Sequence, residues 1–287
     1  MEQTAETKYH NAFHRERPEH GLCDDFSFRH PKMQPGQRAK IFAPFAALSG
    51  FEEALESKLE ASVGRTEPGE EVQEMCCRYY MELSPRLRPI VEAAANSRLY
   101  QNNIAKIPKP LITEGEVFPD SLVPVIASNR AGKKTVFPMI WGYHVQGVGR
   151  LIANARVETA PEKPAFRDGW AMHRCIIPAS WYYEWEHIPT ANGKTKAGEK
   201  YAIMPKGGEL TWLCGLYRME EGYPHFVILT REPGESIAFI HDRMPMILPE
   251  EAVERWIDPN MNPHAMLSAA LTDMVAEKAH CDPLRSG

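Results

Sequence analysis

The feature that most constrains the fold of this chain is a series of short apolar runs separated by turn-forming residues. Runs of this kind, rich in β-branched and aromatic side chains, are typical of strands. The sequence shows neither a regular alternation of strands with helices nor a glycine-rich phosphate loop, which argues against a doubly wound fold. We therefore predict a mostly antiparallel α+β domain. The clearest runs cover residues 174–177, 181–185, 200–204, 210–217 and 225–230.

Three helices are expected towards the C-terminus. The first covers residues 235–240, and the second covers residues 250–257 directly after Pro249. A proline just before a helical run is a common start signal. The third covers residues 263–277, so the helices are predicted to flank the strands.

Length and composition describe an ordinary globular chain. Its 287 residues can bury a proper core in one large domain or two smaller ones. Hydrophobic residues make up 43% and charged residues 25%, and no run approaches the roughly eighteen apolar residues of a membrane span. The polar N-terminus lacks the apolar stretch of a signal peptide. We predict a cytoplasmic protein with no membrane partner.

The charge is unevenly distributed along the chain. The formal net charge is -5, and residues 1–74 contain 9 basic and 14 acidic residues, so the rest of the chain holds 24 of each. The whole chain is therefore no obvious nucleic-acid binder by net charge. The neutral remainder nevertheless leaves room for a local basic groove.

The six cysteines do not suggest a disulfide framework, because the chain is too long for a small secreted scaffold. Cys175 and Cys214 lie in apolar runs and are expected to be buried as small hydrophobic residues. Cys76 and Cys77 are different, since two adjacent thiols follow a glutamate-rich stretch. They indicate either a reactive thiol or nothing.

The N-terminal quarter divides into three parts. Residues 1–32 read as a polar arm, where histidines could hold a metal but a solvated arm is the favoured interpretation. Residues 38–50, R-A-K-I-F-A-P-F-A-A-L-S-G, resemble the YolD-like family, which implies a small module from DNA-damage and translesion contexts. An amphipathic helix should follow over residues 51–61. We predict a helical or extended module over 1–61 and a linker over 62–74, rich in Gly, Pro and Glu.

Several residues carry chemistry. Glu184 lies between Tyr183 and Trp185, where desolvation would raise its pKa and suit a general acid or base. The alternative is a carboxylate that faces solvent from an alternating strand. His241 ends an apolar run, and a single histidine is more often structural than catalytic.

Two other stretches could contact a ligand. Asn154 and Arg156 would face the same way in a strand, where an asparagine can orient an amine and an arginine can grip a phosphate. Trp141 precedes Gly142 and could stack on a base, or it could be a core tryptophan.

Taken together, five motifs resemble the SRAP family, the SOS-response-associated-peptidase-like proteins that process abasic sites in DNA. They follow the family's order and approximate spacing over about residues 75–257. The resemblance implies a barrel-like β core with flanking helices in a domain over residues 75–287. The motifs are M-C-C-R-Y at 75–79, P-M-I-W-G at 138–142, N-A-R-V-E-T at 154–159, R-C-I-I-P-A-S-W-Y-Y-E-W at 174–185 and H-D-R-M-P at 241–245.

The resemblance also implies a covalent chemistry. In the family, a cysteine made N-terminal attacks the aldehyde of an abasic site through its amine, and its thiol then closes a thiazolidine ring. An α-amino group suits this attack because its pKa lies near 7.7–8.0, so a useful fraction is neutral at pH 7. Cys76 would be this nucleophile. No cofactor and no metal are implied.

The family's roles carry over to other matching positions. The resemblance implies that Asn154 holds the amine, Glu184 shuttles protons, and His241 is a second acid or base near the sugar. It places the DNA contacts at Arg78, Trp141, Arg156, Trp185 and Thr230. The implied partner is single-stranded DNA with abasic sites, and the YolD-like segment could contact translesion or replication proteins. We expect a monomer, associated with the nucleoid.

The sequence departs from the family's pattern at one decisive point. In the chain as given, Met75 and the residues before it precede Cys76, so the nitrogen of Cys76 is an amide and is not nucleophilic. Either the Met75–Cys76 bond is cleaved, for example by autoproteolysis in a hydrolase or lyase, or the extension blocks the chemistry and leaves a non-covalent DNA-binding module. A cysteine peptidase built on Cys76 and His241 is the third alternative. Cys77 and Trp181 also stand where smaller residues are commoner in the family.

Overall fold

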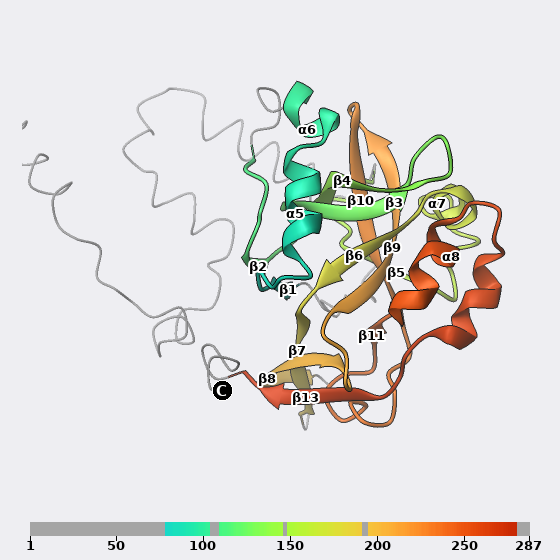
Figure 1. Ribbon diagram of the computed structural model, residues 1–287. Coiled ribbons are helices and arrows are strands. Elements are labelled where there is room, and N and C mark those ends of the chain that lie inside the picture. Colours follow the sequence, from blue (N-terminus) through green and yellow to red (C-terminus); the bar gives the residue numbers. More distant parts are fainter. Residues whose placement is uncertain (1–77, 104–108, 146–147, 191–194, 280–287) are drawn as a thin grey trace, which may run out of the picture. The chain divides into compact units, whose positions relative to one another are not determined.

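A computed structural model describes residues 78–103, 109–145, 148–190 and 195–279 (Figure 1). The predictions for the polar arm, the YolD-like segment, the linker and Cys76 lie outside these residues. None of the helices in the described ranges is both long enough and apolar enough to cross a membrane.

Five strands close into a small barrel. The pairings run β10–β4–β3–β6–β9 and return from β9 to β10, and all of them are antiparallel except β10–β4. Because closure pairs both edges of the sheet, it removes the exposed edges that an open sheet leaves. This ring confirms the mostly antiparallel, barrel-like core. Its strands are β3 (Leu122–Ser128), β4 (Lys134–Trp141), β6 (Arg174–Ala179), β9 (Thr211–Glu220) and β10 (Tyr223–Arg231).

Three short strands extend the barrel. β5 pairs with β10 in parallel, β11 pairs with β10 and β12 pairs with β9. They bring the chain segments that follow β4 and β10 to one edge of the barrel. Their bounds are Asn154–Arg156 for β5, Met244–Pro245 for β11 and Ile247–Leu248 for β12.

A second sheet of five strands has the order β13-β8-β7-β1-β2. It is joined to the barrel at Ser180, the single residue between β6 and β7, whose amide donates to the Tyr80 carbonyl (2.8 Å). Figure 1 shows β7 continuing from β6 towards β8 and β13. The strands are β1 (Arg78–Met81), β2 (Gly115–Val117), β7 (Trp181–Pro189), β8 (Thr195–Pro205) and β13 (Met274–Lys278).

The helices are short and cover the barrel. α5 packs on β3 and β4, α7 on β6 and β9, and α8 on β6 and β3. This cover explains why β6 is buried along its whole length, since a strand enclosed on both faces need not alternate. The bounds are Arg88–Ala95 for α5, Arg98–Asn103 for α6, Arg167–Met172 for α7, Glu250–Ala252 for the 3-10 turn η2, Val253–Ile257 for α8 and Pro263–Ala269 for the 3-10 helix η3.

Arg174 is the one charged residue of this barrel wall that is almost fully buried, with 1% of its surface exposed. Its guanidinium donates to the carbonyls of Trp256 (2.8 Å), Trp170 (2.8 Å) and Ala171 (2.6 Å), and further to those of Asp258 and Met261. Burial is the main reason that its pKa is lowered. The side chain ties the C-terminal ends of α7 and α8 to the start of β6.

All five predicted strand runs are confirmed, and so is the helical segment at 250–257. Two helix predictions are wrong. Residues 235–240 form consecutive turns, with amide-to-carbonyl bonds from Ile237 to Gly234 and from Ile240 to Ile237. The segment at 263–277 is helical only over η3, because its second half joins the second sheet as β13 and pairs with β8.

Candidate active site

The site begins where β1 pairs with β7. Arg78 stands opposite Tyr183, and Tyr79 stands opposite Tyr182. Glu184 is therefore the next residue of β7 beyond the point where the described part of β1 begins. This register places the carboxylate predicted to shuttle protons beside the start of the first strand.

Glu184 is buried, with 3% of its surface exposed. The strand position opposite it on β8 belongs to Tyr201, and the amide of Trp185 donates to Glu184 Oε1 (3.2 Å). The alternative of a solvent-facing carboxylate is thus wrong. A carboxylate held among aromatic strand residues is protected from bulk water, as acid–base chemistry requires.

His241 lies against the same strand. Its ring is 3.9 Å from that of His187, measured between centroids, at an interplanar angle of 51°. The His187 amide donates to the Ile240 carbonyl (2.8 Å). These contacts fix the turn that carries His241 to the far half of β7, three residues beyond Glu184.

The His241 ring is held at one nitrogen. Nδ1 lies 2.9 Å from the amide nitrogen of Arg243 and 2.8 Å from Asp242 Oδ1. It can accept from the amide or donate to the carboxylate, but not both at once. Nε2 is buried and has no hydrogen-bond partner among the described residues.

The surroundings keep this histidine neutral. Burial, reinforced by the neighbouring His187, lowers the pKa of His241 to about 4. A neutral imidazole offers a lone pair that can accept a proton during a reaction, and a pKa this low makes it a weak base in the free protein. His187, His241 and Asp242 also offer ligand atoms within 4.8 Å of one another, but the nearby Arg243 guanidinium opposes a cation there.

Asn154, Arg156 and Thr230 meet at the barrel edge. Asn154 opens β5 opposite Ile228, and Arg156 ends it opposite Thr230. Thr230 is buried, and its hydroxyl reaches the Ala155 carbonyl at 3.5 Å. Arg156 is exposed, as a phosphate contact requires.

Arg243 joins this edge to the His241 turn, a role that sequence reasoning missed. Its guanidinium makes two bonds to the Glu158 carboxylate (2.9 and 2.7 Å) and one to the Thr230 carbonyl (2.7 Å). Burial alone would raise the pKa of Glu158, but the bonds to Arg243 outweigh it and lower that pKa. Arg243 and Glu158 both lie within motifs that resemble the family, and this position in the motifs is the sequence signal from which their role could have been inferred.

Arg78 and Trp185 belong to a partly exposed cluster of cations and aromatic rings. The Arg78 guanidinium lies 4.7 Å from the Phe118 ring centroid and 5.1 Å from that of Trp185. Lys200 Nζ lies 5.3 Å from the same Trp185 ring. Glu116 pairs with both cations, at 3.4 Å from Arg78 and 3.0 Å from Lys200. Such a surface offers both positive charge and aromatic stacking to a single-stranded nucleic acid.

Trp141 does not face solvent. The ring is fully buried between Tyr79 (5.3 Å) and Phe226 (6.2 Å), and its Nε1 donates to the Ala153 carbonyl (2.9 Å). The prediction that it stacks on DNA is therefore wrong for this structure. The alternative interpretation, that Trp141 is a core residue of the barrel, is confirmed.

The fold thus places the candidate site residues in two neighbouring groups. Glu184, His187 and His241 lie along β7, while Asn154, Arg156 and Thr230 lie at the β5–β10 edge. The turn from His241 to Arg243 connects them. Arg78 and Trp185 lie on the other face of the second sheet from the Glu184 side chain, because Arg78 stands opposite Tyr183 and neighbouring strand residues point to opposite faces.

The sequence is matched by a family model described as "SOS response associated peptidase (SRAP)" over residues 75–286. The chain belongs to the SRAP family.

Relatives within the family carry a common description. The chain is 36% identical over 156 residues to "Abasic site processing protein YoaM" of Bacillus subtilis, covering 50% of this chain and 64% of that protein. It is 27% identical over 128 residues to "Abasic site processing protein YedK" of Escherichia coli, covering 42% and 54%. It is 26% identical over 124 residues to "Abasic site processing protein HMCES" of Xenopus tropicalis, covering 37% of each.

Solved structures support the fold. A phage-related protein of Bordetella bronchiseptica matches with a TM-score of 0.54 at 21% identity, covering 71% of this chain and 94% of that one. A protein of Bacteroides thetaiotaomicron matches with the same score and identity, covering 74% and 95%. The α+β SRAP-like architecture is therefore established for the described domain.

Proposed function

We propose that this chain processes abasic sites in single-stranded DNA by forming a covalent bond through Cys76. The relatives' shared description as abasic site processing proteins supports the substrate class. The buried Glu184 beside the start of β1 carries the assignment of the reactive centre.

Chain connectivity supports Cys76 as the nucleophile. Consecutive Cα atoms are about 3.8 Å apart, so the Cα of Cys76 can lie no further than about 7.6 Å from that of Arg78. Arg78 stands opposite Tyr183, the neighbour of Glu184. Cys76 precedes by two residues a strand position that pairs beside Glu184, and this closeness along the chain supports its choice as the nucleophile.

The proposed reaction has two steps. The neutral α-amine of Cys76 attacks the aldehyde carbon, and loss of one water gives a Schiff base. The Cys76 sulfur then adds to the C=N carbon, and the thiol proton passes to the nitrogen, which closes the five-membered thiazolidine. No oxidant or reductant is needed.

Glu184 and His241 would move the protons of these steps. Glu184 would accept a proton as the amine attacks and return one to the departing hydroxyl. His241 would act at the sugar. When its Nδ1 donates to Asp242, Nε2 is free to accept a proton; when Nδ1 accepts from the Arg243 amide, Nε2 carries one. Asn154 would orient the amine through its amide group.

The exposed cationic side chains would bind the phosphates of the DNA strand. Arg156 at the barrel edge and Arg78 beside Trp185 present positive charge, and Trp185 offers a ring face. Phosphate contacts of this kind weaken as salt rises, because bound counterions are released. We propose these residues as the DNA contacts and Thr230 as part of the pocket wall.

The N-terminal extension must leave for the covalent reaction. We propose cleavage between Met75 and Cys76, by the same site or by another protease, since an amide nitrogen cannot form a Schiff base. Contacts of the YolD-like segment with translesion or replication proteins, and a nucleoid location, remain predictions.

A crosslinking assay tests the proposal. The purified chain is incubated with a single-stranded oligonucleotide that carries one abasic site, and covalent complexes are resolved on a denaturing gel. We expect a complex from the parent chain, none from Cys76→Ala, and an undiminished one from the adjacent control Cys77→Ala. Equal crosslinking by both variants would overturn the role of Cys76.

The alternative function is non-covalent binding of single-stranded DNA. The 75 residues before Cys76 favour it, because they block the amine in the uncut chain. Salt-sensitive binding by fluorescence anisotropy, without any covalent complex, would identify this function instead.

A further inference from the structure

A second cluster of titratable side chains lies at the β9–β10 hairpin and takes no part in the proposed reaction. The turn has Glu221 and Gly222 at its centre, both with positive φ (50° and 84°), the geometry of a tight two-residue hairpin. Its register pairs Glu220 with Tyr223 and Arg218 with His225. Directly opposite residues share a face and so do alternate residues of one strand. Arg218, Glu220 and His225 therefore point to the same side.

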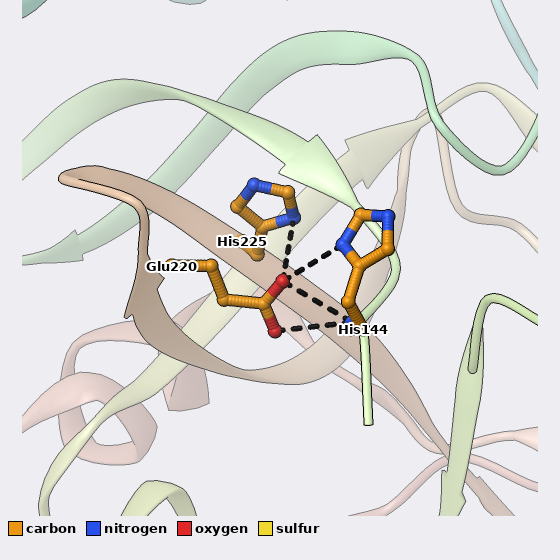
Figure 2. Close-up of side chains that lie close together, drawn as sticks. All are labelled: His144, Glu220 and His225. Carbon is orange, nitrogen blue, oxygen red and sulfur yellow. Dashed lines mark hydrogen bonds and ion pairs between the residues drawn. The ribbon is translucent and has the colours of Figure 1, made fainter. Parts of the chain in front are cut away.

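His144 completes the cluster from the segment that follows β4. Its Nδ1 lies 2.9 Å from Glu220 Oε2, and the Nδ1 of His225 lies 3.5 Å from the same oxygen. Figure 2 shows both imidazole rings turned towards the Glu220 carboxylate. The Gly142 carbonyl oxygen lies 2.9 Å from Nδ1 of His225. Two nitrogens and two oxygens from three chain segments thus converge.

We propose that His144, Glu220 and His225 bind a divalent transition-metal ion, with zinc as the reference ion. The family resemblance implies no metal, so this site departs from that expectation. The inference does not rest on the reaction at Cys76.

The spacing of the donors supports this assignment. Zinc bonds to imidazole nitrogen and carboxylate oxygen are about 2.0–2.2 Å long, and tetrahedral coordination then separates neighbouring ligand atoms by roughly 3.3–3.5 Å. The separations here are 2.9, 3.5 and 2.9 Å. The ligand atoms of the three residues all lie within 4.8 Å of one another. An ion bound between the two Nδ1 atoms and Oε2 requires each imidazole to carry its proton at Nε2, and the Gly142 carbonyl is the adjacent oxygen.

Arg218 makes hydrogen bonds that orient the proposed ligand residues. Arg218 donates to Glu220 Oε1 (2.7 Å) and to the His144 carbonyl (2.7 Å). It occupies Oε1, while the His144 amide lies 3.2 Å from Oε1 and 3.1 Å from Oε2, and Oε2 is the oxygen nearer to the two imidazoles. Hydrogen bonds to a ligating carboxylate fix its orientation. The guanidinium charge also weakens the attraction for a cation, so moderate affinity is expected rather than that of a structural zinc site.

An ion here would clamp three segments. His144 follows β4, Glu220 ends β9 and His225 lies in β10. The segment from Gly142 onward leads directly to Asn154 at the start of β5.

The test is a zinc titration of the full chain, at about pH 7.5 where imidazole is mostly neutral. The N-terminal residues carry further histidines and cysteines, so the measured quantity is the difference in zinc equivalents between variants, by calorimetry and by metal analysis after gel filtration. We expect His144→Gln and Glu220→Gln each to bind one equivalent fewer than the parent. His173→Gln, an exposed histidine elsewhere, should match the parent. Equal stoichiometry in all four chains would overturn the proposal.

A second measurement guards against a variant that merely disturbs the hairpin. In the parent chain, zinc should shift the side-chain nitrogen resonances of His144 and His225, recorded by long-range ¹H–¹⁵N correlation, while that of His173 stays in place. Resonances of His144 and His225 that remain unchanged at saturating zinc would refute the site, whatever the variants do.

Discussion

Replacement of His241 by glutamine should remove a large part of the acid sensitivity of this fold. His241 is buried, and its pKa in the folded chain is lowered from 6.5 to about 4, chiefly by burial and by His187. The unfolded chain therefore binds a proton that the folded chain does not bind between these two pH values. The folded state loses stability as the pH falls through this window.

The size of the effect follows from the two pKa values. At pH 7 the folded histidine is neutral and roughly a quarter of the unfolded histidine is protonated, so the residue contributes only about 0.2 kcal/mol. At pH 4.5 the unfolded histidine is nearly all protonated and the folded one only partly. The free energy of unfolding should fall by about 2 kcal/mol between these conditions because of His241 alone.

Urea denaturation at pH 7 and at pH 4.5 measures this loss. The parent chain should lose about 2 kcal/mol more than His241→Gln over the interval, since the contributions of other groups largely cancel in the difference. His173→Gln is the matched control and should lose as much as the parent. If the parent and His241→Gln lose the same free energy, His241 is not held neutral by the fold and its role as a base is unsupported.

Three further predictions concern other parts of the described domain. Gly142→Ala should destabilise the chain by about 1–3 kcal/mol, because φ is +115° and a Cβ would lie 2.3 Å from a Leu151 methyl carbon, whereas Gly132→Ala, at φ +73° with open space, should cost clearly less in the same thermal melts. Arg174→Leu should lower the free energy of unfolding by about 3 kcal/mol or more, since buried carbonyls lose their donor; a change below about 1 kcal/mol in urea titrations would contradict this account. Arg156→Gln should weaken binding of single-stranded DNA and reduce the slope of log affinity against log salt by about 0.7, and an unchanged slope in anisotropy titrations would remove Arg156 from the DNA contacts.

The strands could be predicted because their signal is local. Runs such as 225–230 are apolar, β-branched or aromatic, and bounded by turns, so their identity does not depend on distant contacts. Residues 274–277 were predicted as helix because nothing local in the sequence shows that they pair with β8, about seventy residues earlier, and this pairing decides their conformation. Residues 235–240 form consecutive turns, because the amides of Ile237 and Ile240 bond to carbonyls three residues before them.

The candidate site also contains some residues that the sequence predicts and some contacts that only the fold creates. Glu184 and His241 could be predicted as site residues from the motifs. The contact between the rings of His187 and His241 is tertiary, and no sequence pattern predicts it. The burial of Trp141 depends on barrel closure, which places Tyr79 and Phe226 on either side of it. His144, Glu220 and His225 are separated by 76 and 5 residues, so no spacing pattern could have joined them.

The most direct test of the central claim is the intact mass of the purified chain, before and after incubation with abasic single-stranded DNA. The account predicts a species that begins at Cys76 and then gains the mass of the DNA less one water, and Cys76→Ala should abolish the gain. A full-length chain that binds the DNA but gains no mass would contradict covalent processing and would leave a DNA-binding protein whose extension blocks the chemistry.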